Sequence, residues 1–475
     1  MKNMRIPALS VFMLLALFAG AAKAQTFSVL YNFGSVQWDP ANPSWGGLVA
    51  QGRDGNLYST TPSGGAPGGG SVFKIAPSGN VTSLFGFGGS NEDGWAPYSG
   101  VTLASDGNLY GSNLNGGISD AGVVFKISPT GTVAVIYSFE GGRYGAFPYA
   151  APIQGTDGNF YGTTYFLPFG TVYRLTPTGN LTTLYAFDST HGANPIGALI
   201  QGTDGNFYGT TYAGGSTNSG TVFKITPSGK LTVLFNFDGT HGAAPYAQLV
   251  QGNDSNFYGT TSAGGSGGDG VVFKITSTGK ISILHNFTGA PDGGYPYGGL
   301  AQATDGNFYG TTSQGGTSGG TGFGTIFEIT STGTLSVLHD FDDTDGRTPQ
   351  ATLFQSTSGL LYGDTTYGGD GILCACGTFY SLDLGLSPFA RLLQTTGKVG
   401  KLIEILGQGF TVTNSVSFNG SAASFKVMSD TYLTAVVPVG ATTGPVIVTT
   451  SSGTLTSNQK FRVIPKLAGI SSSEE

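Results

Sequence analysis

Short runs of alternating apolar and polar residues, separated by glycine-containing turns, fill the chain from residue 27 to about residue 382. One representative unit predicts four strands, at 196–202, 206–211, 221–225 and 231–237. The turns between its paired strands contain Asp-Gly or Ser-Gly, and glycine accepts the positive φ that tight hairpin turns need. No segment has a convincing period of 3.6 residues, so the pattern predicts strands rather than helices.

This four-strand unit is repeated. The phrase Asp-Gly-Asn-Phe-Tyr-Gly-Thr-Thr returns in seven variants that are 47 to 53 residues apart. Its tyrosines are Tyr58, Tyr110, Tyr161, Tyr208, Tyr258, Tyr309 and Tyr362. Four short strands in each of several copies of this length are typical of a β-propeller.

The register of the repeat predicts how the ring closes. Residues 30–33 match the fourth-strand phrase before any complete repeat has begun, and the seventh repeat lacks a fourth strand of its own. Adding residues 27–33 to the last repeat as its outermost strand accounts for both mismatches and removes exposed sheet edges. We therefore expect a seven-bladed propeller over residues 25–386.

The repeated phrases resemble the GloVer (Gloeo/Verruco) tandem repeat of secreted bacterial proteins, a resemblance that covers residues 27 to about 382 and implies a propeller. From about Ser387 the period stops, and residues 387–466 resemble an IPT/TIG immunoglobulin-like module. The matching phrases include 405–410, 416–420, 437–441, 444–448 and 461–463. The expected fold class is all-β, with a seven-bladed β-propeller followed by a small immunoglobulin-like β-sandwich.

The two ends of the chain indicate export. Lys2 and Arg5 precede an apolar run to Ala22, and Ala22-Lys23-Ala24 offers small residues at a cleavage site. Residues 1–24 are therefore expected to be a secretory signal peptide, with an uncleaved membrane anchor as the alternative. The polar tail at 467–475 implies no anchor of its own. We expect an extracellular or periplasmic protein with no stable membrane insertion after cleavage.

Composition narrows the classes of partner. There are 81 glycines, only 10% of residues are charged, the net charge is −7, and no basic run occurs. Nucleic acid is therefore excluded as an expected partner, because binding to phosphates needs clustered positive charge. We expect a monomer without a cofactor.

The loops joining strands two to three and four to one are long and vary between copies, so we assign the ligand face to them. At one position of the repeat, eight residues before the turn aspartate, four copies carry tyrosine. The candidate ligand-binding residues are Trp45, Trp95, Tyr98, Tyr149, His191, His241, Tyr246 and Tyr297. Such aromatic side chains suit sugar rings or peptides. Packing between blades is the alternative role for the tyrosines.

Two further sets recur with the repeat. Glutamine stands three residues before the turn in six copies, where hydrogen bonding between blades is the favoured role and lining of the channel the alternative. These glutamines are Gln51, Gln154, Gln201, Gln251, Gln302 and Gln355, with Leu103 in the remaining copy. The turn aspartates, such as Asp204, are interpreted as turn caps rather than as metal ligands.

No motif predicts catalysis or a metal site. The segment 264–271, which matches the calcium-binding nonapeptide of β-rolls, stands alone. The acidic loop at 340–345 is favoured as a solvated turn, and Cys374 and Cys376 form either a local disulfide or a free pair. We expect a secreted binding protein, with polysaccharide or a cell-surface protein as candidate partner. The alternative is a carbohydrate-active or other hydrolytic enzyme with its site in the propeller funnel. A carboxylate pair about 5–10 Å apart in the funnel would favour the enzyme.

Overall fold

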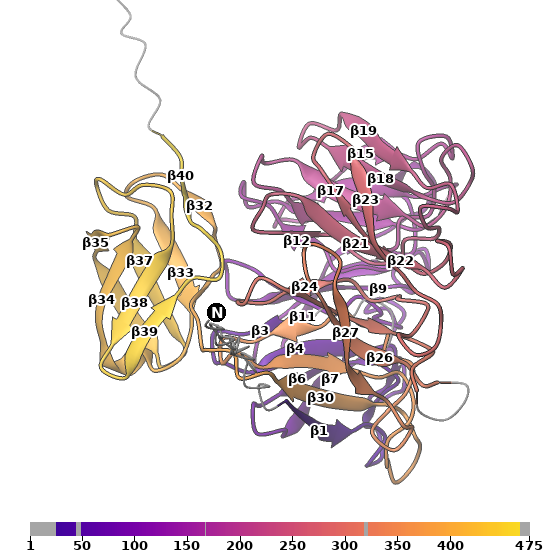
Figure 1. The fold of residues 1–475 in the computed structure, drawn as a ribbon, viewed down its shortest axis with the longest axis horizontal. Coiled ribbons are helices and arrows are strands. Elements are labelled where there is room, and N and C mark those ends of the chain that lie inside the picture. Colours follow the sequence, from indigo (N-terminus) through magenta and orange to yellow (C-terminus); the bar gives the residue numbers. More distant parts are fainter. Residues whose placement is uncertain (1–24, 44–48, 167, 318–321, 466–475) are drawn as a thin grey trace, which may run out of the picture.

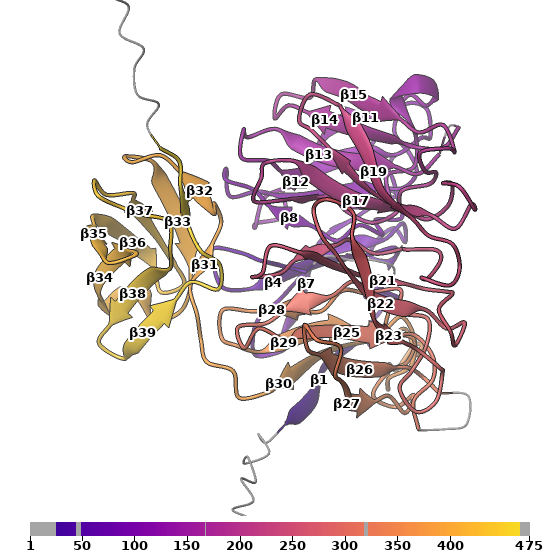
Figure 2. The same ribbon diagram turned by 45° about the horizontal axis from the view of Figure 1, so that its top comes forward.

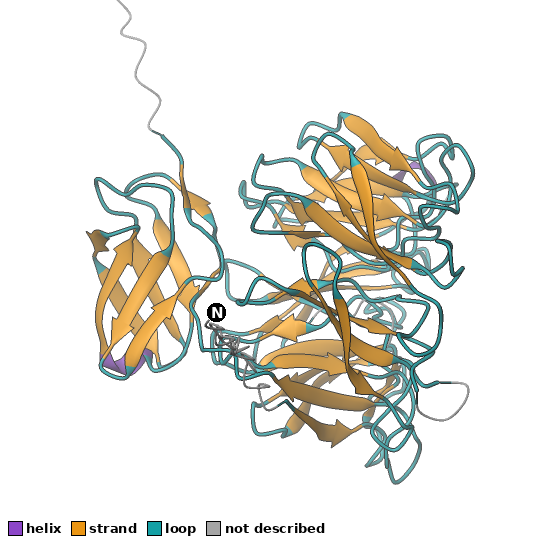
Figure 3. Cartoon of the chain, in the orientation of Figure 1, coloured by secondary structure: helices purple, strands orange, loops and turns teal. Residues whose placement is uncertain are grey.

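The computed structural model describes residues 25–43, 49–166, 168–317 and 322–465. The expected signal peptide and the polar tail lie outside these residues. Within them, strands and loops make up nearly everything, and the helical content is two 3-10 turns, η1 (Gly142–Tyr144) and η2 (Phe410–Val412) (Figure 3). The expected all-β class is confirmed.

The repeat region forms seven four-stranded antiparallel sheets, which we number by their order along the chain (Figure 1). Sheet 1 is β3 (Ala50–Gln51), β4 (Leu57–Thr61), β6 (Ser71–Ile75) and β7 (Val81–Gly86); sheet 2 is β8 (Thr102–Leu103), β9 (Leu109–Asn113), β10 (Val123–Ile127) and β11 (Val133–Ser138); sheet 3 is β12 (Ile153–Gln154), β13 (Phe160–Thr164), β14 (Thr171–Leu175) and β15 (Leu181–Ala186); sheet 4 is β16 (Ile200–Gln201), β17 (Phe207–Thr211), β18 (Thr221–Ile225) and β19 (Leu231–Asn236). Sheet 5 is β20 (Val250–Gln251), β21 (Phe257–Thr261), β22 (Val271–Ile275) and β23 (Ile281–Asn286); sheet 6 is β24 (Ala301–Gln302), β25 (Phe308–Thr312), β26 (Thr325–Ile329) and β27 (Leu335–Asp340); sheet 7 is β28 (Phe354–Gln355), β29 (Leu361–Asp364), β30 (Thr378–Asp383) and β1 (Thr26–Asn32). A small ribbon, β2 (Pro40–Ala41) with β5 (Ser63–Gly64), accompanies sheet 1.

Sheet 7 joins the two ends of the repeat region. Strand β1 pairs antiparallel with β30, with Tyr31 opposite Phe379, and Figure 2 shows the two strands side by side. The N-terminal strand is thus the outer strand of the last sheet, as the register of the repeat predicts.

Apolar clusters join each sheet to the next. Between sheets 4 and 5, Tyr208 stacks on Phe257 with ring centroids 3.9 Å apart. An equivalent cluster occurs at every junction, including the one where Tyr362 of sheet 7 packs with Leu57 and Phe73 of sheet 1. The seven sheets therefore form a closed cycle, called the ring below, in a propeller-like arrangement.

The first strand of each sheet is shorter than expected. In sheet 4 the pattern predicts a strand over 196–202, whereas β16 spans only Ile200–Gln201. The preceding segment lies against its neighbour near the ring axis, where a Cβ on Gly197 would be 2.6 Å from the backbone of Ala247. Close backbone contact, rather than a hydrogen-bonded ladder, holds these residues.

The C-terminal region has two further four-stranded sheets. They are β31 (Arg391–Leu392), β33 (Leu402–Leu406), β37 (Tyr432–Val436) and β36 (Phe425–Ser429), and β35 (Ser421–Ala423), β34 (Thr413–Phe418), β38 (Val446–Thr450) and β39 (Gly453–Thr456); β32 (Thr396–Gly397) pairs in parallel with β40 (Arg462–Val463). Their shared core includes Phe410, Phe418 and Phe461, and its buried members all lie between residues 390 and 463. The C-terminal sheets therefore have a core separate from the ring (Figure 1).

The C-terminal sheets contact the ring at sheet 1. The guanidinium of Arg53 pairs with the carboxylate of Glu404 and lies over the ring of Tyr432, 4.9 Å from its centroid. The Thr431 hydroxyl donates to the carbonyl of Arg53 over 2.7 Å. Arg53 also donates to the carbonyl of Ser105 in sheet 2. One arginine therefore links two blade-like sheets to the C-terminal region.

Two other contacts fix the C-terminal sheets. Near sheet 7, the Phe389 amide donates to the carbonyl of Thr357 over 3.0 Å. On sheet 4, Arg462 donates to the carbonyl of Thr203. All these ring residues belong to turns between first and second strands, so the C-terminal region lies over one face of the ring.

Candidate functional site: the loop face

The two long loops of each repeat emerge on the same side of the ring, which we call the loop face; the opposite side is the turn face. In sheet 4, Ala193 of the four-to-one loop bridges Ala213 of the two-to-three loop, and in sheet 5 Ala243 bridges Ala263. Equivalent bridges recur in sheets 2, 3, 6 and 7. The predicted common face of the variable loops is therefore present.

A left-handed residue followed by proline directs each loop toward the ring axis. Ala244 has φ 55° although it has a side chain, and Pro245 and Tyr246 follow it. The same backbone occurs before a proline in all seven copies, at Asn42, Ala96, Phe147, Asn194, Ala244, Tyr295 and Thr348. Non-glycine residues rarely adopt this conformation, which costs on the order of 1–2 kcal/mol. Strained backbone of this kind often accompanies function.

A glycine of the preceding sheet makes room for this proline. Gly220 has φ 94°, and a Cβ there would be 2.7 Å from Cδ of Pro245 and 2.4 Å from the carbonyl of Thr211. No side chain fits between the sheets at this point. The glycine before the third strand thereby sets the path of the next loop.

The four predicted tyrosines lie together on this face. Tyr98 and Tyr149 have ring centroids 5.8 Å apart, and Tyr246 and Tyr297 are 5.0 Å apart with nearly perpendicular planes. All four are half-buried. The structure therefore brings the tyrosines of four sheets into one group, called the tyrosine cluster below.

Three further tyrosines that the sequence interpretation missed join this cluster. Tyr165 contacts Tyr149 at 5.1 Å, and Tyr212 contacts Tyr246 at 4.9 Å. Tyr367 lies near Tyr98, because a charge on Tyr367 would raise the pKa of Tyr98. The side chain of Tyr367 is 46% exposed. Tyr165 and Tyr212 both directly follow the Thr-Thr of the repeated phrase, a signal that could have identified them.

Burial favours the neutral form of the four predicted tyrosines of the cluster. Burial raises the pKa of Tyr246 above its ordinary value, and the nearby hydroxyls of Tyr212 and Tyr297 add to the shift. Burial is likewise the largest cause of the raised pKa values of Tyr98 and Tyr149. The hydroxyls of Tyr98, Tyr149 and Tyr246 therefore stay protonated at neutral pH.

The space beneath the cluster is small. The cavity lined by Tyr149, Tyr246 and Tyr297 has a volume of about 20 Å³. Ala150, Gly197 and Ala247 also line this cavity, and such a space has room for about one water molecule. The tyrosines thus stand over a nearly closed floor.

The remaining predicted residues lie elsewhere. His191 and His241 are exposed, pair with Asp188 and Asp238 at 2.8 Å, and pack edge-on against aromatic rings of outer strands β15 and β19. They belong to the rim rather than to the tyrosine cluster. Trp95 is half-buried and its backbone bridges Asn115. Trp45 lies outside the described residues.

The recurring glutamines form hydrogen bonds between sheets on the turn face. Gln251 of sheet 5 accepts from the amide of Thr203 in sheet 4 over 2.9 Å. Equivalent bonds to Gln154, Gln201, Gln302, Gln355 and Gln51 measure 2.9 to 3.1 Å. The favoured structural role is confirmed. The remaining junction, between sheets 1 and 2, has Leu103 in place of the glutamine. There the side chain of Arg53 donates to the carbonyl of Ser105 instead.

The turn aspartates also have a structural role. Asp204 accepts from the side-chain amide of Asn206 over 2.7 Å and from the hydroxyl of buried Tyr208 over 2.8 Å. Partial burial opposes ionisation of Asp204, but these hydrogen bonds outweigh it and lower its pKa. The repeated Asp-Gly-Asn-x-Tyr phrase is therefore explained by one bonded triad, as the turn-cap interpretation expects.

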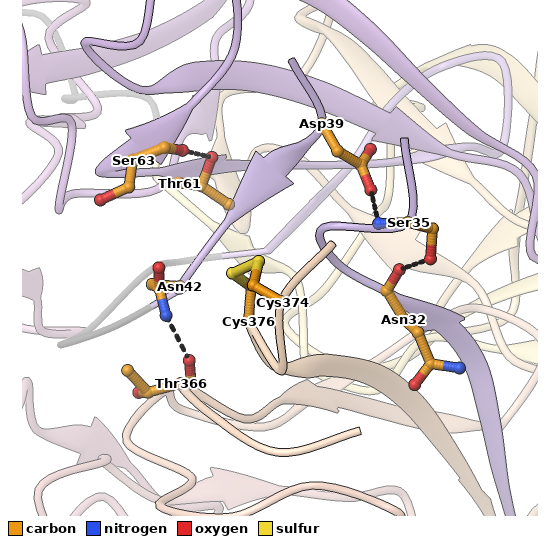
Figure 4. Close-up of a disulfide and its surroundings, with 9 residues drawn as sticks. All are labelled: Asn32, Ser35, Asp39, Asn42, Thr61, Ser63, Thr366, Cys374 and Cys376. Carbon is orange, nitrogen blue, oxygen red and sulfur yellow. Dashed lines mark hydrogen bonds between the residues drawn. A yellow bond between two sulfur atoms is a disulfide. The ribbon is translucent and has the colours of Figure 1, made fainter. Parts of the chain in front are cut away.

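The two cysteines form a disulfide, which settles the alternative left open by the sequence. Figure 4 shows Cys374 and Cys376 next to the segment that follows β1. Asn42 donates from its amide to the carbonyl of Cys376 over 2.8 Å and from its side chain to the carbonyl of Thr366 over 3.1 Å. The disulfide therefore lies where the N-terminal segment is tied to sheet 7.

The described part of the chain lacks both a metal-binding cluster and a membrane-spanning helix. It contains no group of three or more His, Cys, Asp or Glu side chains arranged to hold a metal ion. In the same residues, no helix has the length and apolar character needed to cross a membrane.

Several solved structures are similar to this chain at low identity. The extracellular domain of a putative hybrid two-component system from B. thetaiotaomicron is 10% identical with a TM-score of 0.49, covering 93% of this chain and 59% of that one. This chain thus matches little more than half the length of that domain. A gluconolactonase from Xanthomonas campestris is 13% identical (TM-score 0.39; 75% and 89% covered), and a putative 6-phosphogluconolactonase from Bacteroides uniformis is 15% identical (0.41; 65% and 94%). Likenesses this distant carry no argument about function.

No curated protein matches the sequence. The family model described as the Gloeobacter/Verrucomicrobia repeat does match, three times, at residues 16–167, 132–321 and 250–444. These overlapping segments run through most of the 475 residues and include all seven repeated sheets. The chain therefore belongs to the Gloeobacter/Verrucomicrobia repeat family.

Proposed function

We propose that this chain is a secreted, non-catalytic binding protein whose tyrosine cluster contacts a polysaccharide or a cell-surface partner. In this proposal residues 1–24 direct export, residues 25–386 form a seven-bladed β-propeller, and residues 387–466 form an IPT/TIG-like module. The mature protein is a monomer, and the loop face is its ligand face.

The observation that carries the proposal is the convergence of seven tyrosines from several sheets on the face with the variable loops. Aromatic faces cover the apolar side of a sugar ring while hydroxyls bond its edge. Because the floor beneath the cluster is nearly closed, the ligand lies across the cluster and does not enter the ring.

The enzyme alternative lacks a carboxylate pair at this place. None of the residues lining the cavity under the cluster is acidic. Asp188 and Asp238 bond histidines of their own loops at the rim, and Asp342 accepts from Thr344 within its own turn. A glycosidase needs two carboxyl groups that face each other across a bond.

A glycan and polysaccharide screen of residues 25–475, with product analysis on any hit, tests the proposal. For a ligand that binds, Tyr297→Ala removes part of the aromatic surface, so we expect about a 5- to 100-fold weaker affinity, equivalent to roughly 1–3 kcal/mol. Tyr144→Ala, in η1 away from the cluster, is the matched control and leaves affinity unchanged. Release of a cleaved product would favour the enzyme instead.

A further inference from the structure

A second and much larger hollow lies on the side opposite the tyrosine cluster. A cleft of about 1240 Å³ separates the turn face of sheets 3 to 6 from the C-terminal sheets. Binding pockets for small molecules usually have roughly 300–1,000 Å³. The cavity under the tyrosines has only about 20 Å³. A ligand segment that is enclosed by protein on two sides therefore fits in the cleft, whereas the cavity under the tyrosines is too small for it.

The cleft is held open by contacts at both ends. At one end Phe389, in its wall, is bonded to Thr357 of sheet 7. At the other end Arg462 is bonded to the carbonyl of Thr203 in sheet 4. Since these sheets lie on different sides of the ring, the C-terminal region bridges the turn face. Such a preformed cleft at a junction of two units is a common place for ligands.

The chemistry of the walls selects an uncharged ligand rich in hydroxyl groups. Sixteen of the 33 lining residues are Ser, Thr, Asn or Gln. The charged ones are two carboxylates, Asp204 and Asp305, facing two cations, Lys460 and Arg462, so the lining has no net charge. A polyanion such as nucleic acid or an acidic polysaccharide would need an excess of positive charge.

Apolar side chains complete the cleft in a way that suits sugar rings. Among the polar residues that line it, Pro388 and Ile464 are exposed and Ile200, Val250 and Leu386 are partly exposed. A sugar ring has C–H faces that pack on such groups and hydroxyl edges that bond to amides and hydroxyls. Together with the neutral charge, this mixture favours a saccharide over a peptide.

We propose that the cleft between the turn face and the C-terminal sheets binds a segment of a neutral oligosaccharide. The inference shares its ligand class with the proposed function but uses a different site. A chain held on both faces would be bound at two places, which raises the overall affinity without any new contact at either site.

The test uses the mature chain, residues 25–475, and neutral hexasaccharides of glucose, xylose, mannose and N-acetylglucosamine, measured by calorimetry. Asn253→Trp fills the cleft from an exposed position in its wall. Ser105→Trp is the matched control, because Ser105 has the same repeat position but does not line the cleft. Both residues donate backbone amides to the next glutamine, Gln302 and Gln154.

We expect Asn253→Trp to weaken the tightest hexasaccharide at least tenfold and Ser105→Trp to change it less than twofold, with both variants melting like the parent. Thr304→Trp, also exposed in the cleft wall, serves if Asn253→Trp does not fold. Equal affinities for cleft and control variants overturn the inference, as does binding of an extended peptide library in place of every hexasaccharide. A failure of the loop-face proposal appears separately, as unchanged affinity in Tyr297→Ala.

Discussion

The turn face and the loop face of the ring are built from the same repeat but are held in different ways. On the turn face, six of seven junctions carry the same glutamine bond, as between Gln251 and Thr203. On the loop face, the described repeats instead share a left-handed residue before proline, as at Ala244, and then diverge. The regular face stabilises neighbouring sheets, whereas the strained face positions side chains.

Departures from the repeat are as informative as its copies. On the turn face, Leu103 breaks the glutamine series where Arg53 contacts the C-terminal sheets through Glu404. On the loop side, Asp364 stands where other repeats have a small hydroxyl residue such as Thr210. Leu103 and Asp364 therefore mark two positions where one sheet differs from the other copies of the repeat.

Asp364→Thr should have the largest effect on stability. Burial raises the pKa of Asp364 to about 7, and its Oδ1 has no hydrogen-bond partner among the described residues. The folded state therefore holds a proton that the unfolded chain releases near pH 4, so stability falls as pH rises from about 4 to 7 and stays low above. Threonine instead donates to a neighbouring carbonyl, as Thr210 does to Ala247.

We expect Asp364→Thr to be more stable than the parent at pH 8, by at most roughly 4 kcal/mol, with the difference shrinking toward pH 4. Chemical denaturation at pH 8 and at pH 4.5 measures it. A gain of the same size at both pH values would show that packing, and not ionisation, is responsible.

Asp204→Ala tests the triads of the turn face. The change leaves the buried hydroxyl of Tyr208 without its acceptor, so we expect a loss of about 1–3 kcal/mol in the free energy of unfolding. Asp188→Ala, in an exposed loop-face position, is the control and should cost less than about 0.5 kcal/mol. Equal losses would remove the distinction between the two faces.

The same triads predict acid sensitivity. The pKa values of Asp106, Asp157 and Asp204 are lowered, because hydrogen bonds outweigh the opposing effect of burial. The stability they contribute is complete above about pH 4 and is lost as pH falls through their folded-state values. Melting temperatures between pH 5 and pH 2 should fall steeply, and less steeply in Asp204→Asn.

Gln251→Leu removes one bond between sheets and copies the residue found naturally at Leu103. We expect a loss of about 1 kcal/mol, because the amide of Thr203 loses its acceptor but is close to solvent. The reciprocal variant, Leu103→Gln, should give a gain of similar or smaller size. A loss in Leu103→Gln would show that this junction depends on Arg53 alone.

Ala244→Gly should have the smallest effect. Glycine adopts φ 55° without steric cost, which we expect to raise stability by about 0.5–1 kcal/mol despite its greater freedom in the unfolded chain. Ala263→Gly, at the bridge partner of the neighbouring Ala243, lacks this strain and should instead lower stability. Thermal melts of both variants compare them, and a loss in both would mean that the loop stores no strain.

The repeat made most of the ring predictable. Turn chemistry, strand order and the pairing of β1 with β30 all follow from local phrases and their register. The position of the C-terminal sheets could not be predicted in this way. It depends on contacts between residues far apart in the sequence, such as Thr431 and Arg53, which are 378 residues apart. The tyrosines could be placed on one face, but the volume beneath them depends on backbone contact near the axis, as at Gly197.

The most direct test of the division between the faces compares Tyr246→Ala with Gln251→Leu, measuring for each the dissociation constant for a confirmed ligand and the melting temperature. The account predicts that Tyr246→Ala weakens binding with little change in melting temperature, and that Gln251→Leu lowers the melting temperature with binding unchanged. Unaltered affinity and a clear loss of stability in Tyr246→Ala would contradict it, and would leave the tyrosine cluster as packing between sheets.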